Sequence, residues 1–231
     1  MKTIGLLGGM SWESSLEYYR IMNEAVRDRL GGLHSARCIL YSVEFGEIQP
    51  LLEGGRYDEL EAALCAGAAS LGRAGADLVL IATNTMHLFA DAVEEAAGVP
   101  LVHIADATGE AIARAGLRTV ALLGTSVTME GDFYRRRLEE RYGIRTIVPG
   151  DRAAFDRIIF DELCQGIVRD PARKQVEAAI DDCVSRGAQG VILGCTELPL
   201  LVSRAPVPLF DTTRIHAQAA VTLALERDRP R

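Results

Sequence analysis

Two similar segments of the chain end in residues that could exchange a proton with a small molecule. Residues 75–85 read GADLVLIATNT and residues 187–197 read GAQGVILGCTE, and they align without a gap. The alignment places Thr83 opposite Cys195. A thiol is a far stronger acid than an aliphatic hydroxyl, so Cys195 is the better candidate for acid–base chemistry. The pair suits a reaction that needs one group on each face of a single atom.

Two further pairs of segments repeat in the same order. Residues 3–8 (TIGLLG) match residues 119–124 (TVALLG), and residues 99–102 (VPLV) match residues 207–210 (VPLF). Three collinear matches argue for a chain of two similar halves. Halves that face each other would form a cleft with one strand end from each side, so we expect Thr83 and Cys195 to lie across it.

Cys195 lies between Gly194 and Thr196 at the end of an apolar run. A helix that follows directly could present backbone N–H groups to a thiolate, which predicts a lowered thiol pKa. The alternative is a buried, inert cysteine, the commoner fate of a lone cysteine after an apolar strand. The polar residues opposite Cys195 in the repeat favour the functional interpretation. Cys65 and Cys164 lie in helical patterns and are interpreted as structural.

Four hydrogen-bonding side chains cluster where the equivalent strand of the first half should end. They are Thr83, Asn84, Thr85 and His87. Any of the first three could cap a following helix, and capping is compatible with ligand binding, so we expect both. A histidine in such a place is more often structural than catalytic. We therefore assign His87 a supporting role behind the binding residues.

Two loops after strands are rich in glycine and hydroxyl residues. Residues 8–11 read GGMS, and their repeat partner, residues 124–126, reads GTS. Backbone N–H groups and hydroxyls in such loops can bind a carboxylate. A dinucleotide site is the alternative, but both copies lack G-x-G-x-x-G, and no acidic residue stands about 20 positions on at a strand end. The sequence also lacks metal-binding spacings and a G-x-S-x-G elbow, so we expect neither a metal nor a cofactor.

Short apolar runs alternate with longer stretches of helical period, which predicts βα units with parallel sheets. Helices are expected over residues 57–74, 129–142, 175–185 and 212–226, and a first helix is expected from the spacing of Leu16, Tyr19, Met22, Val26 and Leu30. Strands are expected at residues 3–7, 38–43, 78–82, 101–104, 119–123, 145–148, 191–193 and 208–210.

The predicted fold is an α/β fold with two pseudosymmetric domains, each a four-stranded parallel sheet flanked by helices. The first domain is expected to comprise residues 1–104 with 211–231, and the second residues 105–210. Ligands bind at the carboxyl ends of parallel strands. The four segments 8–11, 83–85, 124–126 and 195–197 are therefore expected to converge on one cleft between the domains.

Composition limits the class of partner. The chain of 231 residues is 48% hydrophobic and 25% charged, as in ordinary soluble domains. A net charge of −7 without a basic run argues against nucleic acid or an anionic membrane surface, so a small molecule is the expected partner. The start of the chain reads as a buried strand rather than a signal peptide, and no apolar stretch approaches the roughly 20 residues of a membrane helix. Five cysteines without paired spacing are expected to be reduced, in the cytoplasm.

Four motifs occur in order along the chain. They are GGMSWES at residues 8–14, NTMH at 84–87, GCTEL at 194–198, and DTT at 211–213 with IHA at 215–217. Together they resemble the aspartate/glutamate racemase family, and closely its amino-acid racemase branch. The likeness runs from the first predicted strand to the last helix.

The resemblance implies a cofactor-independent racemase of two pseudosymmetric α/β domains, usually dimeric, so a homodimer is expected. Two acid/base residues would flank the α-carbon of an amino acid, one removing the α-proton and the other returning a proton to the opposite face. Here they would be Cys195 and Thr83. The residues expected to bind the substrate are Met10, Ser11, Asn84, Thr85, Thr125, Ser126, Thr196 and Glu197.

The sequence departs from the family pattern at two positions. Thr83 stands where the family has the first of two cysteines, and a hydroxyl is a much weaker acid. Either Thr83 works in a proton path with Asn84, another neighbour or a water, or catalysis is one-sided. Cys164, within DELCQG at residues 161–166, stands where some acidic-amino-acid racemases of the family place a lysine for the substrate's side-chain carboxylate. Specificity for aspartate is therefore not predicted.

Two other functions fit the same residues. A superfamily enzyme that protonates a carbanion from one face, such as a malonate-type decarboxylase, needs only Cys195. An amino-acid sensor derived from a racemase would need neither acid/base residue, although the presence of Cys195 argues against it. Exchange of the substrate α-hydrogen with solvent separates the three functions, because only a racemase combines exchange with inversion.

Overall fold

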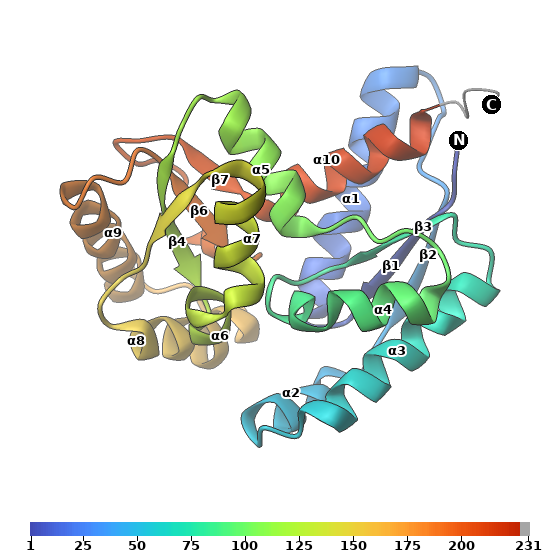
Figure 1. Cartoon of the computed structure of the whole chain (residues 1–231), viewed down its shortest axis with the longest axis horizontal. Helices are drawn as coiled ribbons and strands as arrows, with labels where there is room; N and C mark the ends of the chain where they lie inside the picture. The colour runs from blue at the N-terminus through green and yellow to red at the C-terminus, as the bar shows by residue number, and fades with distance from the viewer. Residues whose placement is uncertain (227–231) are drawn as a thin grey trace. The chain divides into compact units, whose positions relative to one another are not determined.

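The computed structural model describes residues 1–226 and divides into two compact units. The first comprises Met1–His103 together with the chain from His216 onward, and the second comprises Ile104–Ile215. Each unit has a parallel β-sheet flanked by helices (Figure 1), which confirms the predicted fold class. In the part of the chain that the structure describes, no helix combines the length and apolar character needed to cross a membrane.

The first unit contains a three-stranded sheet in the order β2-β1-β3, with β1 in the centre. Both neighbours run parallel to β1. The strands are β1 (Ile4–Gly8), β2 (Cys38–Ser42) and β3 (Leu78–Ile81). Its helices are α1 (Trp12–Leu30), α2 (Phe45–Glu53), α3 (Tyr57–Arg73), the 3₁₀-helix η1 (Thr85–Phe89), α4 (Ala90–Ala97) and most of α10 (Thr212–Leu225).

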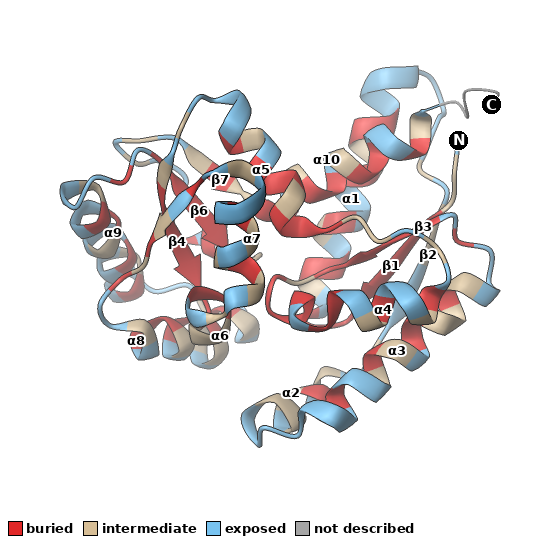
Figure 2. Cartoon of the chain, in the orientation of Figure 1, coloured by how far each residue is buried: buried red, intermediate tan, exposed pale blue. Residues whose placement is uncertain are grey.

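The helices of the first unit cover both faces of its sheet, because successive side chains of a strand point to opposite faces. Ile4 and Leu6 of β1 pack in one cluster with apolar residues of α1 and α10. Leu7 of β1 and Ile81 of β3 pack in another cluster with residues of α2, α3 and α4. Figure 2 shows β1 and β3 as buried strands covered by partly exposed helices, whereas β2 is half-buried to exposed.

The first helix forms as predicted, but part of its predicted core face is wrong. Met22 and Val26 are buried, whereas Leu16, Tyr19 and Leu30 are 57%, 52% and 46% exposed. The buried stripe of α1 instead runs through Ser14, Ser15, Tyr18, Ile21, Met22, Ala25 and Val26. Small serines face the sheet because the strand end is tightly packed: a Cβ on Gly8 would lie 2.3 Å from the Ser15 hydroxyl oxygen.

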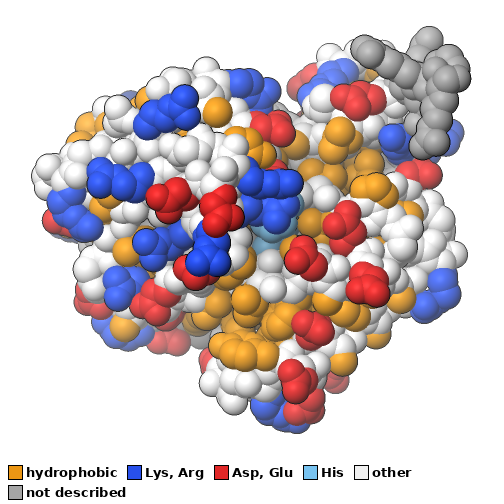
Figure 3. Space-filling view, viewed as in Figure 1, with side chains coloured by type: hydrophobic (Ala, Val, Ile, Leu, Met, Phe, Trp, Pro, Cys, Tyr) orange, Lys and Arg blue, Asp and Glu red, His pale blue; other side chains and the backbone are white. Residues whose placement is uncertain are grey.

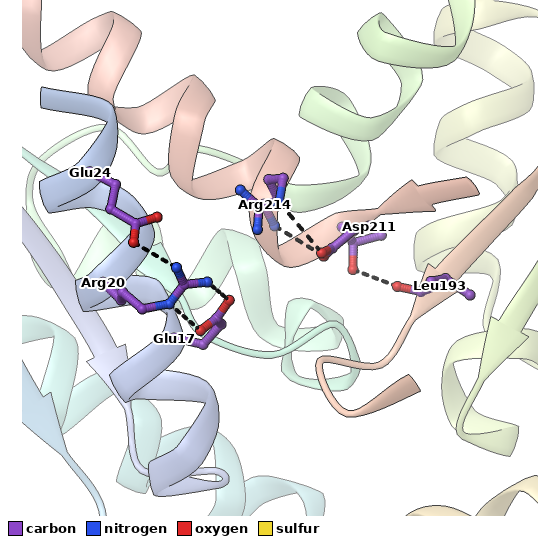
Figure 4. Close-up of polar contacts among 7 residues, drawn as sticks. Glu17, Arg20, Glu24, Leu193, Asp211 and Arg214 are labelled. Atoms are coloured by element: carbon purple, nitrogen blue, oxygen red, sulfur yellow. Dashed lines mark hydrogen bonds and ion pairs between the residues drawn. The ribbon is translucent and has the colours of Figure 1, made fainter. Parts of the chain in front are cut away.

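Local interactions explain where α1 begins and how its outer side is held. The Ser11 hydroxyl accepts a hydrogen bond from the Ser14 backbone N–H, which caps the helix. On the outer side, Arg20 pairs with Glu17 and Glu24 (Figure 4), at spacings that stabilise a helix by a few tenths of a kcal/mol per pair.

The fourth strand predicted for the first unit, at residues 101–104, is wrong. Leu101 forms only an isolated parallel bridge with Val79, and α5 already begins at Ile104. Pro100 accepts a hydrogen bond from the Val79 N–H but has no N–H to donate, so it cannot extend the ladder. The described part of this unit therefore has three strands where four were expected.

The second unit contains a four-stranded parallel sheet in the order β5-β4-β6-β7. Its strands are β4 (Thr119–Gly124), β5 (Arg145–Ile147), β6 (Val191–Gly194) and β7 (Leu209–Asp211), each within two residues of its predicted bounds. Its helices are α5 (Ile104–Arg114), α6 (Ser126–Glu130), α7 (Asp132–Tyr142), α8 (Arg152–Asp156), the π-helical turn η2 (Arg157–Glu162), the 3₁₀-turns η3 (Leu163–Gln165) and η4 (Leu198–Leu200), and α9 (Asp170–Ser185).

One apolar core joins the helices of the second unit to its sheet. α5 packs on α7, and α9 packs on β4. At the start of α10, an Asp211 carboxylate oxygen accepts from the Arg214 N–H, and the Thr212 hydroxyl donates to the Leu193 carbonyl at 2.9 Å (Figure 4). The first bond holds the start of α10, and the second ties the residue that follows β7 to β6.

The two sheets follow the same plan. β1 lies between β2 and β3, and β4 lies between β5 and β6. Thr83 follows β3 and Cys195 follows β6, so the residues paired by the sequence repeat occupy equivalent positions in their own units. This equivalence accounts for the collinear repeats.

Candidate active-site residues of each unit

In the first unit, two of the predicted loops follow neighbouring strands. Leu7 of β1 is paired in register with Ile81 of β3, so the loop at residues 8–11 and the segment at residues 83–85 leave the same edge of the sheet. The Ala82 N–H donates to the Leu7 carbonyl and extends the pairing by one residue. The sheet thus brings together the predicted site residues of this half.

The loop at residues 8–11 is held by its own polar groups. Gly9 has a positive φ of 91°, and a Cβ there would lie 2.3 Å from the Val43 carbonyl oxygen, so only glycine fits. Its N–H donates to the Ser15 hydroxyl at 2.8 Å and is therefore engaged within the protein. Met10 is buried in the apolar core, and Ser11 caps α1. Both residues have structural roles, and their contact with substrate stays a prediction.

The segment after β3 is buried except around Thr83. Asn84, Thr85 and His87 are 2%, 7% and 2% exposed, whereas Thr83 is partly exposed. For Asn84 the expected side-chain cap of the next helix is wrong. Asn84 is the residue before η1, but its backbone is helical and its side chain makes no capping bond, since a cap requires an extended backbone at that position. Instead, the His87 ring contacts the Thr83 carbonyl oxygen at 2.8 Å.

In the second unit, β4 and β6 bring the other two predicted segments together. Gly124 and Gly194 are paired in register at the strand ends. A Cβ on Gly194 would lie 2.7 Å from the Leu123 carbonyl oxygen, so this close approach of the strands requires a residue without a side chain. Thr125 and Cys195 follow directly.

Thr125 and Ser126 begin α6. The Thr125 hydroxyl oxygen accepts from the Thr128 N–H and caps the helix. The Ser126 N–H donates to a carboxylate oxygen of Asp156 at 2.8 Å. The sequence predicts that N–H groups of this loop bind the carboxylate of a ligand. The Ser126 N–H is instead already bonded to the protein's own Asp156 carboxylate.

Cys195 and Thr196 share one buried hydrogen-bond acceptor, the carboxylate of Glu197. The Cys195 thiol donates to Glu197 Oε2 at 3.0 Å, and the Thr196 hydroxyl donates to the same oxygen at 2.5 Å. Glu197 is 6% exposed. Burial, and then the nearby Glu197 charge, raise the pKa of Cys195 well above its ordinary value. The prediction of a lowered thiol pKa is therefore wrong.

The local backbone explains that correction. The expected helix after Cys195 is only the 3₁₀-turn η4 of three residues, with Pro199 in its first turn. Proline has no N–H, and the Leu198 N–H donates to the Cys195 carbonyl rather than to the thiol. The Glu197 backbone N–H lowers the pKa of Cys195, but no helix N-terminus adds to this effect, so burial and the Glu197 carboxylate outweigh it and the pKa is raised.

Cys164 lies in the electrostatic environment of Cys195. Its negative form contributes to raising the pKa of Cys195, and its side chain packs against the same core. It sits in η3, directly after the π-helical turn η2, an irregularity that often occurs at functional sites. The interpretation of Cys164 as purely structural misses this proximity.

Among the polar residues that have a buried oxygen atom without a hydrogen-bond partner in the described part of the chain, three lie within or beside the sequence motifs. They are Glu13, Glu162 and Thr213. Buried polar atoms are normally satisfied, so such atoms ask for an explanation such as a ligand. None of them is among the site residues predicted from the sequence, although Glu13 and Thr213 lie within the motifs and Glu162 immediately follows Asp161 in DELCQG.

On the face drawn in Figure 3, acidic side chains lie among the basic ones rather than leaving one continuous basic surface. This fits the net charge of −7 and a small-molecule partner.

Comparison with known proteins places these features in a family. The sequence pattern of the Asp/Glu/Hydantoin racemase family matches residues 7–220, so the chain belongs to that family. It is 24% identical to the broad specificity amino-acid racemase RacX of Bacillus subtilis (strain 168), over 73% of this chain and 74% of RacX.

Solved structures agree with this assignment. A Yersinia pestis protein proposed to be an Asp/Glu racemase is 50% identical, with a TM-score of 0.91, over 98% of this chain and all of that one. An aspartate racemase homologue from Pyrococcus horikoshii OT3 is 39% identical, with a TM-score of 0.83, over 98% of this chain and all of that one. The suspected family is thereby confirmed.

Proposed function

We propose that this protein is a cofactor-independent amino-acid racemase in which Cys195 and Thr83 act on opposite faces of the substrate α-carbon. The observation that carries the proposal is the hydrogen bond from the Cys195 thiol to the buried Glu197 carboxylate at 3.0 Å. It gives the thiol proton an acceptor, so one residue can serve as acid in its resting state and as base after transferring its proton.

For a substrate that presents its α-proton to Cys195, every proton transfer can be accounted for. Glu197 takes the thiol proton, and the thiolate then removes the α-proton, leaving the C–H electron pair on the α-carbon. Thr83 donates its hydroxyl proton to the other face, which forms the new C–H bond. It regains a proton from water, and the resulting hydroxide is neutralised by the proton held on Glu197. The enantiomer leaves and every group returns to its starting state.

The opposite enantiomer uses the resting thiol directly as the acid. Its α-proton must then leave on the Thr83 side: Glu197 takes a proton from water, the hydroxide deprotonates Thr83, and the alkoxide removes the α-proton, after which the Cys195 thiolate regains a proton from Glu197. Both directions start from the same resting state, but the α-proton is removed by a thiolate in one direction and by a less accessible alkoxide in the other. We expect unequal rates of inversion from the two enantiomers, balanced by unequal apparent affinities because the overall equilibrium is fixed.

Incubation with L- and D-amino acids in deuterated solvent tests the proposal. The wild-type enzyme should exchange the α-hydrogen and invert the substrate. Cys195→Ser should lose nearly all turnover while ligand binding stays within about tenfold, since serine fills the space but has no accessible anion near neutral pH. Absence of exchange with every amino acid tested would refute the function.

The proposal does not specify the side chain of the substrate. The panel of amino acids should be broad, because the relative RacX is described as having broad specificity.

The proposal also includes a homodimer in the cytoplasm. The family resemblance supports the dimer, and five free cysteines favour a reducing compartment. Light scattering should report twice the 25.0 kDa chain mass.

A one-sided decarboxylase of malonate-type acids is the second candidate. It is favoured by the protonated resting state of Cys195, because protonation of a carbanion from one face needs only an acid. Release of carbon dioxide from an aryl- or alkylmalonate, without exchange of amino-acid α-hydrogens, would select this function over racemisation.

A further inference from the structure

Three of the four histidines lie together in the buried interior of the first unit. His87, His103 and His216 are 2%, 6% and 0% exposed. The His87 ring centre is 4.7 Å from that of His103 and 5.6 Å from that of His216. The fourth histidine, His34, is exposed. Burial of polar rings is costly unless their hydrogen bonds are satisfied, so the cluster calls for a role.

The contacts of His216 define its proton positions. Its Nε2 lies 2.6 Å from the Val102 carbonyl oxygen, which can only accept, so Nε2 carries the hydrogen and donates. Its Nδ1 then accepts from the Tyr18 hydroxyl at 2.8 Å. Both nitrogens of the neutral ring are satisfied, and Tyr18 also packs edge-on against it. The neutral His216 ring is therefore held in one orientation, and the His87 ring packs against it.

The contacts of His87 define one of its proton positions in the same way. Its Nδ1 lies 2.8 Å from the Thr83 carbonyl oxygen, so Nδ1 carries the hydrogen and donates to that carbonyl. The acceptor belongs to the residue proposed as the second acid/base group. The bond thus joins a side chain of η1 to the backbone of the segment that follows β3.

This bond matters because the backbone around Thr83 has little other regular support. β3 ends at Ile81 and η1 begins at Thr85, so residues 82–84 belong to neither a strand nor a helix. Fixing the Thr83 carbonyl fixes the peptide plane after Thr83. The direction of its Cα–Cβ bond is then constrained as well, which limits the positions that the hydroxyl can reach.

We propose that His87 is a positioning residue for Thr83, and that the rings of His103 and His216 keep His87 in place. This inference rests on the proposed function, in which Thr83 returns a proton to the α-carbon. A hydroxyl is a weak acid, so its contribution depends strongly on placement, and a misplacement of about 1 Å can cost about 100-fold in rate.

Two amide substitutions test the proposal because they place a donor differently. The side-chain nitrogen of His87→Asn can replace Nδ1, whereas that of His87→Gln reaches the position of Nε2. We expect His87→Asn to keep kcat for inversion within about threefold of wild type and His87→Gln to lower it about 10- to 100-fold, with KM within about threefold in both. Thermal unfolding should be measured for both, and His34→Gln is the matched surface control.

A second pair of measurements tests whether His87 acts through Thr83. In a Thr83→Ala background, His87→Gln should cause no further loss of the remaining α-hydrogen exchange. Equal kcat values for His87→Asn and His87→Gln, or the same loss in both backgrounds, would overturn the positioning role. Those outcomes leave the racemase proposal intact if the wild type inverts its substrate. A wild type that exchanges no α-hydrogen would overturn the proposed function, and this inference with it.

Discussion

At the scale of single residues, the neighbours of Cys195 decide its chemistry. Its position after a glycine at a strand end suggested a stabilised thiolate, but burial and the Glu197 carboxylate raise its pKa instead. The thiol donates to that carboxylate. In the proposed mechanism Cys195 therefore acts as an acid toward a carbanion, and it needs Glu197 before it can act as a base.

Replacing Glu197 should separate thiol reactivity from turnover. In Glu197→Gln the charge that raises the pKa of Cys195 is gone, so alkylation of Cys195 by iodoacetamide should begin at lower pH than in wild type. Racemisation should nevertheless fall by at least about tenfold, because an amide cannot take the thiol proton. Mass spectrometry can locate the alkylated residue. An unchanged alkylation profile would contradict the assigned effect of the carboxylate.

Substitution of Thr83 should expose the asymmetry of the two faces. Thr83→Ala should slow inversion but can leave α-hydrogen exchange without inversion for the enantiomer whose proton faces Cys195. Thr83→Cys should preserve or raise racemisation by supplying a second thiol. Chiral chromatography and NMR of the same samples in deuterated solvent measure both quantities. Wild-type inversion rates from both enantiomers in Thr83→Ala would show that another group serves the second face.

His216 should make the protein less stable in acid. Burial lowers the pKa of His216 to about 4, against about 6.5 in an unfolded chain. Between these values the unfolded chain binds a proton that the folded protein does not, so the free energy of unfolding falls as pH decreases. The expected loss between pH 7 and pH 5 is about 2 kcal/mol.

Denaturant unfolding at both pH values measures this loss. His216→Gln should show a smaller pH dependence than wild type by roughly that amount, because glutamine does not titrate. His34→Gln should keep the wild-type dependence, since His34 is exposed. Identical pH dependence in wild type and His216→Gln would contradict the shift.

At the scale of elements, the approach of neighbouring strands places the polar segments. In each unit the central strand and its next neighbour, β1 with β3 and β4 with β6, end in segments that carry the predicted site residues. In the second unit this depends on glycine, because Gly124 and Gly194 face each other across the strand pair. Thr125 and Cys195 directly follow this glycine pair.

Substitution of Gly194 should disturb both stability and the site. A Cβ at this position would lie 2.7 Å from the Leu123 carbonyl oxygen, so Gly194→Ala must push β4 and β6 apart. We expect a loss of about 1–3 kcal/mol in unfolding free energy, with a fall in kcat. Gly150→Ala is the matched control, since a Cβ there meets no atom within 4 Å. Equal effects of the two substitutions in denaturant unfolding would refute the strand-contact argument.

At the scale of the whole molecule, the chain carries one sheet plan twice, each copy with its own apolar core. The two equivalent strand ends carry a hydroxyl residue, Thr83, in one unit and a thiol, Cys195, in the other. The proposed chemistry needs one acid/base group on each face of a carbon atom. A duplicated fold offers a simple origin for such a pair.

The reaction should depend on the side chains of Thr83 and Cys195 rather than on a bound metal or cofactor. Activity is therefore expected to survive dialysis against a chelator and to need no added pyridoxal phosphate. Inversion rates before and after dialysis, compared with a sample reloaded with divalent metal, measure this. Loss of activity that metal restores would contradict the proposed mechanism.

Local patterns in the sequence determined the strand order along the chain, the repeat and most of the candidate site. Apolar runs after turn residues predict buried strands because side-chain periodicity is a local property. The segments at residues 83–85 and 195–197 could be placed at strand ends for the same reason, and the motifs around them indicated the family.

Only the tertiary structure decided which face of α1 is buried, that residues 101–104 form a bridge rather than a strand, and that the thiol of Cys195 stays protonated. It also brought His87, His103 and His216 together from distant parts of the chain. These properties depend on burial and on contacts between segments far apart in sequence. Periodicity and spacing within one segment cannot specify them, because the local electrostatics and packing arise only when the chain has folded.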